Sequence, residues 1–276
     1  MILSAFEAFV HSFLHFFALT LYIYCVKISF VYRQAAQAAK KNGRRTARFF
    51  ACRKIKMSFV KVFYADVSAY YDENALAERK AEVSADRQSR IDRAKRPETK
   101  ALLLGSGLIV PVALKKVFGD FDYEIKVTEM GKPYVSNRDG VFFSVSHTGK
   151  YVLCAVSDTE VGADLEEIAE AQTVMPIADR FFTPLERDAI SLSPSPAEAF
   201  CRLWTLRESY VKMTGKGFDR GLAPLAMVFP SGTPKIKVDG KIKENVFFTE
   251  IRDVYKCRGA VCTEKEAEYS IEKITL

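Results

Sequence analysis

The segment VGADLEE (161–167) places Asp164 and Glu166 two residues apart in a predicted β-strand, after the apolar-rich stretch GKYVLCAVSD. Side chains at i and i+2 of a strand point to the same face. Two adjacent carboxylates repel each other, and burying them without a partner is costly. The pair therefore predicts a bound cation, whereas a solvated edge strand is the alternative that this segment alone leaves open.

A long predicted helix, AEAFCRLWTLRESYVKMTG (197–215), carries Trp204, Glu208 and Lys212 at i, i+4 and i+8. Taken alone, Glu208 and Lys212 are explained by an exposed i,i+4 pair worth about 0.3 kcal/mol. Together with Asp164 and Glu166, Glu208 makes a set of three carboxylates. Such hard oxygen ligands suit Mg²⁺, with Mn²⁺ as the alternative ion, and Lys212 is placed to contact a phosphate oxygen.

Further side chains suited to phosphate oxygens or to a ligand ring lie upstream. They are Arg87 and Arg90, one helical turn apart, Lys100 at the start of the next helix, Ser146 and His147 at a strand end, and Lys132 with Pro133 in a Gly-Lys-Pro turn. Singly, each is better explained by a solvated basic face, a structural histidine or an exposed turn. Their types nevertheless favour a phosphorylated ligand.

The charge of the chain is unevenly distributed. Of 41 Lys and Arg, ten lie in residues 1–56, which hold one of the 34 acids, so residues 57–276 hold 31 basic and 33 acidic residues. The net charge of +7 therefore comes from the N-terminal segment. Residues 57–276 carry no excess of positive charge, so the main argument that they bind nucleic acid is removed. The six cysteines form no CxxC pair and only three histidines occur, which argues against zinc and indicates free thiols in a reducing cytoplasm.

Residues 1–56 differ from the rest in composition. Residues 9–26 carry no formal charge and approach the length of about 20 apolar residues that spans a bilayer. The basic residues behind them would keep the body of the protein in the cytoplasm. A genuine membrane anchor, a mis-assigned start upstream of Met57 and a different role all stay open. In each case the chemistry is expected beyond Met57.

Residues 57–160 predict one α/β half. Strands are predicted within residues 58–67 and 123–137, and a strand pair with a turn near Thr148-Gly149 is predicted at 141–158. One polar helix is predicted at 73–96, and a buried helix with Pro111 as a candidate kink is predicted at 99–118.

Residues 161–276 predict a second half of the same kind. The strand at 161–168 precedes a helix capped by Thr183, with Pro184 and Glu186 behind it, and then the long helix, with Ser195 as its predicted cap and Gly215 as its stop. Short strands are predicted at 226–229, 234–238, 245–252 and 268–274. The Ala-Asp pairs at 65–66 and 163–164 follow both opening strands. The sequence thus predicts an α/β (α+β) protein of two similar halves with a cleft between them.

The segments GKPYVSN, FSVSHTG, VGADLEEI, RFFTPLE and LWTLRESYVKMTGKGF occur in this order. They resemble the Sfp-type 4'-phosphopantetheinyl transferases, and the likeness runs from about Phe59 to the last strands. It implies two halves related by a pseudo-twofold axis, with the active site between them. The implied reaction transfers phosphopantetheine from coenzyme A to a serine of an apo acyl or peptidyl carrier protein and releases adenosine 3',5'-bisphosphate.

The resemblance also implies roles for individual residues. Asp164, Glu166 and Glu208 match the Mg²⁺ ligands, Asp164 also lies at the coenzyme A site, and Lys212 matches the lysine that contacts the diphosphate. Glu208 is in addition the candidate base for the carrier serine. Ser146 and His147 match coenzyme A phosphate contacts, Lys132 and Pro133 the adenine-side turn, and Arg87, Arg90 and Lys100 the basic residues that hold phosphates.

The chain departs from this family at Arg207, where lysine is usual before the glutamate, at Ala163, where a β-branched residue is usual, and at Lys100, where arginine is common. Two other functions stay open: a different Mg²⁺-dependent enzyme acting on a nucleotide diphosphate, and a membrane-tethered module that binds coenzyme A or carrier proteins without transfer. Fatty-acid, polyketide and peptide-synthetase carriers are all compatible with the sequence. A monomer is expected, since the two halves already build one cleft.

Overall fold

The computed structural model describes residues 57–217 and 225–276, and Met57–Leu276 form one compact unit. The predicted segment 9–26 lies outside the described residues. The strands are β1 (Ser58–Asp66), β2 (Ile125–Val127), β3 (Pro133–Val135), β4 (Phe142–Thr148), β5 (Tyr151–Ser157), β6 (Val161–Glu167), β7 (Leu225–Val228), β8 (Lys235–Val238), β9 (Lys241–Ile242), β10 (Phe247–Ile251), β11 (Cys257–Thr263) and β12 (Ala267–Lys273). The helices are η1 (Ser68–Tyr71), α2 (Glu73–Lys80), α3 (Ala85–Arg93), α4 (Pro97–Phe118), α5 (Ala171–Phe181), α6 (Pro184–Ser191), α7 (Pro196–Thr214) and η2 (Pro230–Gly232).

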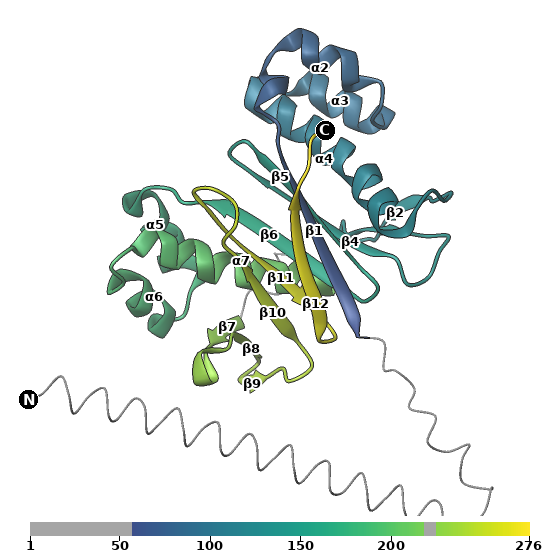
Figure 1. Cartoon of the computed structure of the whole chain (residues 1–276). Helices are drawn as coiled ribbons and strands as arrows, with labels where there is room; N and C mark the ends of the chain where they lie inside the picture. Colours follow the sequence, from purple (N-terminus) through teal and green to yellow (C-terminus); the bar gives the residue numbers. More distant parts are fainter. Residues whose placement is uncertain (1–56, 218–224) are drawn as a thin grey trace, which may run out of the picture. The chain divides into compact units, whose positions relative to one another are not determined.

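Two sheets and two long helices position the site (Figure 1). The first sheet has the order β12-β1-β5-β4 and the second the order β10-β11-β6. Helix α4 packs on the first sheet, and α7 packs on β6 and β11 of the second. The inner faces of the two sheets share a core that includes Val62, Leu153 and Leu165. The mixed α/β class is confirmed, whereas the division at residue 160 stays a prediction.

Alternation along β6 decides which side chains face α7. Val161, Ala163 and Leu165 belong to the core between the sheets, so residues 162, 164 and 166 point to the opposite face, where α7 lies. Gly162 permits a close approach there, because a Cβ at this position would lie 2.0 Å from Ser209 O of α7. The absence of a side chain at Gly162 therefore lets α7 pack directly beside the carboxylates of β6.

Helix α4 is long and apolar enough to cross a membrane by length and composition. It runs as one helix through Pro111, and Leu104, Ile109 and Leu114 are buried in the core beside the first sheet. Because these residues pack against the first sheet, the burial identifies α4 as a core helix. The prediction of a mostly buried helix is confirmed.

Several predicted elements differ from the structure. Residues 73–96 form two helices instead of one, because Ser84 accepts a hydrogen bond from Arg87 N and starts a new helix. Helix α5 and strand β11 were not predicted. Thr183 and Glu186 form the predicted capping box and Gly215 ends α7 in a left-handed conformation, whereas the side chain of Ser195 makes no capping hydrogen bond.

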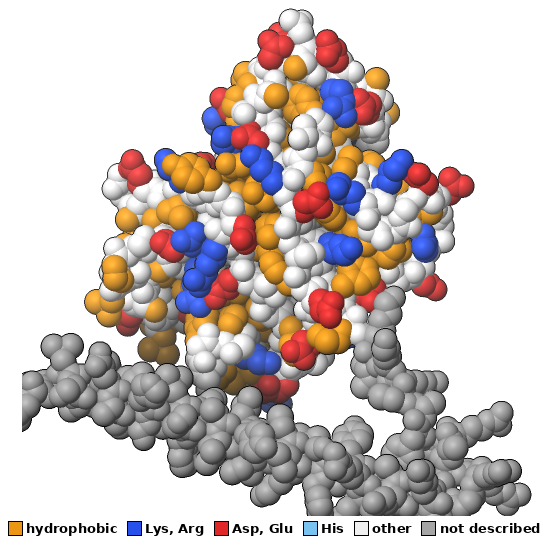
Figure 2. Space-filling view, viewed as in Figure 1, with side chains coloured by type: hydrophobic (Ala, Val, Ile, Leu, Met, Phe, Trp, Pro, Cys, Tyr) orange, Lys and Arg blue, Asp and Glu red, His pale blue; other side chains and the backbone are white. Residues whose placement is uncertain are grey.

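Figure 2 shows that Lys and Arg are interspersed with Asp and Glu on the face seen there. A mixed surface of this kind agrees with the near balance of 31 basic and 33 acidic residues beyond position 56. Charge of both signs on this face does not by itself indicate a nucleic-acid partner.

Candidate functional site

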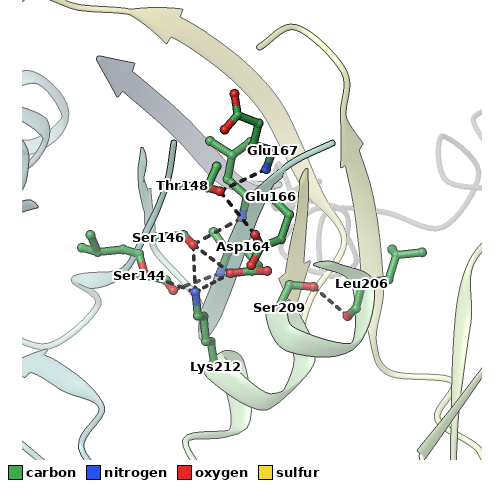
Figure 3. A network of polar contacts seen from close by, with 12 residues as sticks. Ser144, Ser146, Thr148, Asp164, Glu166, Glu167, Leu206, Ser209 and Lys212 are labelled. Atoms are coloured by element: carbon green, nitrogen blue, oxygen red, sulfur yellow. Dashed lines mark hydrogen bonds and ion pairs between the residues drawn. The ribbon is translucent and has the colours of Figure 1, made fainter. Parts of the chain in front are cut away.

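Three hydroxyl side chains of β4 hold β6 at the junction of the two sheets. Ser144, Ser146 and Thr148 lie at i, i+2 and i+4, so they point to one side of the strand. Their oxygens accept hydrogen bonds from the backbone N–H groups of residues 163, 165 and 167, at 3.0, 3.3 and 3.0 Å. The hydroxyls thus replace a backbone ladder between β4 and β6 and fix the position of the carboxylates (Figure 3).

Asp164 lies at the centre of the site. Its side chain is buried, with the residue 3% exposed, and its Oδ1 accepts hydrogen bonds from Lys212 Nζ at 2.6 Å and Ser146 Oγ at 2.8 Å. Lys212 Nζ also donates to Ser146 Oγ at 3.0 Å, so the three side chains form one network (Figure 3). The nearest cation to Asp164 is therefore the ammonium group of Lys212, which the sequence alone had placed toward a phosphate.

Glu166 and Glu208 flank Asp164. Burial, followed by the negative charge of Asp164, raises the pKa of Glu166 to about 7 and that of Glu208 to about 7. Thr148 Oγ1 donates to Glu166 Oε2 at 3.3 Å. Glu208 Oε1 and Asp164 Oδ2 are buried without a hydrogen-bond partner. The strand and the helix thus bring three carboxylates together, and two of their oxygens remain free to bind a ligand.

In the part of the chain that the structure describes, no group of three His, Cys, Asp or Glu side chains converges on one point closely enough to hold a metal ion. Lys212 Nζ lies against Asp164 Oδ1 in this arrangement. The three predicted metal ligands, Asp164, Glu166 and Glu208, therefore lie in one region of the structure. Their coordination of a metal ion stays a prediction.

A cavity of about 290 Å³ adjoins this cluster. It is lined by the 130–133 turn, by residues 143–145 of β4, and by Glu208, Val211 and Lys212 of α7 with the glycines that follow the helix. Lys132 and Pro133 thus lie on the same cavity as Glu208 and Lys212. The Lys132 ammonium is itself engaged, because it donates to Glu160 Oε2 at 2.5 Å and Met213 O at 2.6 Å.

The predicted basic residues are only partly brought together. Partial desolvation and then the positive charges of Lys212 and Arg87 lower the pKa of His147, whose side chain still reaches solvent. Arg87 therefore lies within electrostatic range of the His147 imidazole. Arg87 Nη1 donates to Leu103 O at 3.0 Å. Arg90 is exposed, and Lys100 Nζ lies 3.5 Å from Glu73. Among the described residues, neither Arg90 nor Lys100 contacts the carboxylate cluster.

Sequence reasoning missed Ser144, Thr148 and Glu160. The signal for the first two was present, since hydroxyl residues recur with the strand period at 144, 146 and 148 beside the acids of the next strand. Glu160 precedes β6 by one residue, and nothing in its local pattern indicates its pairing with Lys132, which lies 28 positions earlier.

Comparisons with known proteins agree with this geometry. The profile of the 4'-phosphopantetheinyl transferase superfamily matches residues 160–266, which contain all three carboxylates and Lys212. A 4'-phosphopantetheinyl transferase of Bacillus subtilis is 28% identical over 59% of this chain and 70% of its own length. The transferase HetI of Nostoc is 32% identical over 52% of this chain and 65% of its own length.

The transferase psf-1 of Bacillus pumilus is 32% identical to this chain over 189 residues, which cover 66% of this chain and 77% of the relative. That alignment is longer than the superfamily match, which begins at residue 160, so the likeness extends beyond the segment that carries the carboxylates. With this similarity and a mixed α/β fold that brings Asp164, Glu166, Glu208 and Lys212 together, the chain is a transferase and belongs to the 4'-phosphopantetheinyl transferase family.

Proposed function

We propose that this protein transfers 4'-phosphopantetheine from coenzyme A to a serine of an apo acyl or peptidyl carrier protein in the cytoplasm and acts as a monomer. The observation that carries the proposal is the junction of β6 and α7, where Asp164, Glu166, Glu208 and Lys212 meet beside a cavity. Carboxylates and an ammonium group at the edge of a cavity match the needs of a diphosphate substrate and a divalent cation.

The donor atoms fit Mg²⁺ or Mn²⁺, which prefer carboxylate oxygens. Asp164 Oδ2 and Glu208 Oε1 are buried and lack partners, which is costly unless a ligand satisfies them. Asp164, Glu166 and Glu208 would hold the ion after turning toward a common point. When bound, the ion would supply positive charge that stabilises the charge developing on the diphosphate oxygens.

The residues of the chain would supply the proton acceptor, the hydrogen bonds to the diphosphate and the binding site for the nucleotide. The serine oxygen attacks the β-phosphorus of coenzyme A, the bond from that phosphorus to the bridging oxygen breaks, and adenosine 3',5'-bisphosphate leaves with the electron pair. Glu208 takes the serine proton, since its carboxylate lies at the edge of the cavity beside Lys212. Lys212 donates hydrogen bonds to the diphosphate. The cavity lined by Lys132 and Pro133 receives the nucleotide end.

The test is the intact mass of purified apo-carrier proteins after incubation with the full chain, coenzyme A and Mg²⁺. A fatty-acid carrier and a peptide-synthetase carrier are used in parallel. A gain of one phosphopantetheine group that a chelator abolishes supports the proposal. Coenzyme A that is consumed while both carriers keep their mass indicates hydrolysis instead, and bound but unreacted coenzyme A indicates a binding module.

The carboxylate cluster also predicts a pH-dependent effect of Mg²⁺ on stability. Folded-state pKa values near 7 for Glu166 and Glu208 lie above the ordinary value of 4.5, so the metal-free protein loses stability as pH rises through about 7. An ion binds the deprotonated carboxylates and stabilises the folded state. We expect Mg²⁺ to raise Tm more at pH 8 than at pH 6.

This is measured by thermal unfolding in a chelator and in excess Mg²⁺ at both pH values. The Glu166→Gln variant is the control, because it removes one charge from the cluster and should reduce the Mg²⁺ effect at pH 8. An equal change in Tm at the two pH values would contradict the prediction.

A further inference from the structure

The turn between β2 and β3 forms one wall of the cavity beside Glu208 and Lys212. Residues 130–133 contribute to this wall, and α7 with the glycines that follow it forms the opposite wall. Two hydrogen bonds within the turn stabilise it: Thr128 N donates to Lys132 O at 2.9 Å, and Lys132 N donates to Thr128 Oγ1 at 3.1 Å. The width of the cavity thus depends on how this preformed turn is held against α7.

The hairpin that carries the turn is weakly anchored by its strands. All three residues of β2 are exposed, and Val135 is the buried residue of β3. Exposed strands of this length supply little apolar burial. The hairpin therefore needs another attachment near its tip if the cavity is to keep a defined width.

Lys132 supplies that attachment. Its side chain is 18% exposed, and its Nζ reaches Met213 O at the end of α7 and Glu160 Oε2 just before β6. The stem passes so close to Gly215 that a Cβ there would lie 3.1 Å from Lys132 Cδ. One side chain therefore joins the turn to the helix that bears Glu208 and Lys212, and Glu160 fixes the direction of that side chain.

We propose that Glu160 is a positioning residue that holds Lys132 against the end of α7 and thereby sets the affinity of the cavity for the nucleotide end of the donor. This inference rests on the proposed function for the identity of that ligand. Glu160 does not line the cavity itself; it lines a second pocket, which Lys132 and Glu264 also line. It therefore acts through Lys132.

The experiment measures binding of adenosine 3',5'-bisphosphate and of coenzyme A to the full chain by calorimetry, together with kcat and KM for coenzyme A. In Glu160→Ala we expect both dissociation constants and KM to rise about fivefold, because a hydrogen bond to a charged group is lost and the turn loosens. We expect kcat to stay within about twofold, because the carboxylate cluster is untouched.

Two comparisons separate this role from a general structural one. Glu264→Ala removes a carboxylate from the same second pocket without touching Lys132, and it should leave the dissociation constants unchanged. In a Lys132→Met background, Glu160→Ala should cause no further weakening, because the residue that it positions is already gone.

The proposal would be overturned by unchanged binding in Glu160→Ala, by tighter binding caused by a freed Lys132 ammonium group, or by an equal loss in Glu264→Ala. A kcat that falls while KM stays constant would do the same. The binding measurement needs no carrier protein. If the wild-type protein binds coenzyme A but transfers nothing, the proposed transfer fails while the role of Glu160 is still decided.

Discussion

Replacing Glu208 with glutamine is expected to lower the rate of carrier modification at least a hundredfold, because a positioned general base contributes about 10²–10⁴ in rate. Glutamine keeps the size of the side chain and removes the proton-accepting charge. The fold should be unaffected, since burial and Asp164 already disfavour the charged form of Glu208, as its raised pKa of about 7 indicates. The measurement is the initial rate by intact mass, with Tm as the test of folding.

The matched control is Glu198→Gln on the same helix. Glu198 pairs with Arg258 at the other end of α7, so its loss should leave the rate within about twofold. Titration with Mg²⁺ then separates the two roles of Glu208. If the rate of Glu208→Gln recovers at high Mg²⁺, the residue acts as a metal ligand and not as the base. A variant that keeps full activity in ordinary Mg²⁺ would remove Glu208 from the mechanism altogether.

The second large effect is on stability and concerns Arg207, which precedes Glu208. Arg207 is 3% exposed, and its Nη1 lies 4.0 Å from Oε2 of Glu186, a residue that is also buried. The guanidinium donates to Phe181 O at the end of α5 and to Leu225 O of β7. Removing one partner of a buried pair leaves an uncompensated charge, so Arg207→Met should lower the free energy of unfolding by about 3–5 kcal/mol.

Arg202→Met is the control for Arg207→Met in chemical denaturation. Arg202 lies on the same helix and pairs with Glu250 at 2.7 Å, but its side chain is more exposed, so its loss should cost about 1 kcal/mol. Arg207→Lys should fall between the two, because an ammonium group cannot reproduce the planar fork that contacts two carbonyl groups. If Arg207→Met and Arg202→Met lost the same unfolding free energy, the buried pair of Arg207 and Glu186 would contribute no more to stability than the more exposed pair of Arg202 and Glu250.

Local patterns in the sequence were enough to predict the elements whose signals are strong. The alternation around Asp164 and Glu166 predicted β6, the Thr183–Glu186 box predicted the start of α6, and Gly215 predicted the end of α7. Strand β11 was missed although it is central to its sheet. Its sequence CRGAVCT contains small residues and a glycine, and its strand conformation depends on pairing with β6 and β10.

The site could be predicted as a set of residues more readily than as a geometry. The motif residues identified the carboxylates and Lys212, but their spacing does not report that Lys212 lies against Asp164 or that three hydroxyls hold β6 to β4. Contacts such as Lys132 with Glu160 join distant positions and follow only from the packing of α7 on Gly162 and of the hairpin on α7. Such contacts depend on tertiary structure, which no short window of sequence contains.

The pairing of β1 with β12 determines when, during synthesis, the first sheet can acquire all of its strands. Ser58–Asp66 lies at the start of the described chain, and its parallel neighbour Ala267–Lys273 lies almost at the end. Ile274 N donates to Tyr64 O, and Tyr70 Oη donates to Leu276 O, so the last residues are tied to the first strand. Because β12 is synthesised after the other described strands, the edge of β1 that it covers lacks this partner until residues 267–273 have left the ribosome. The first sheet therefore gains β12 only after residues 267–273 have been made.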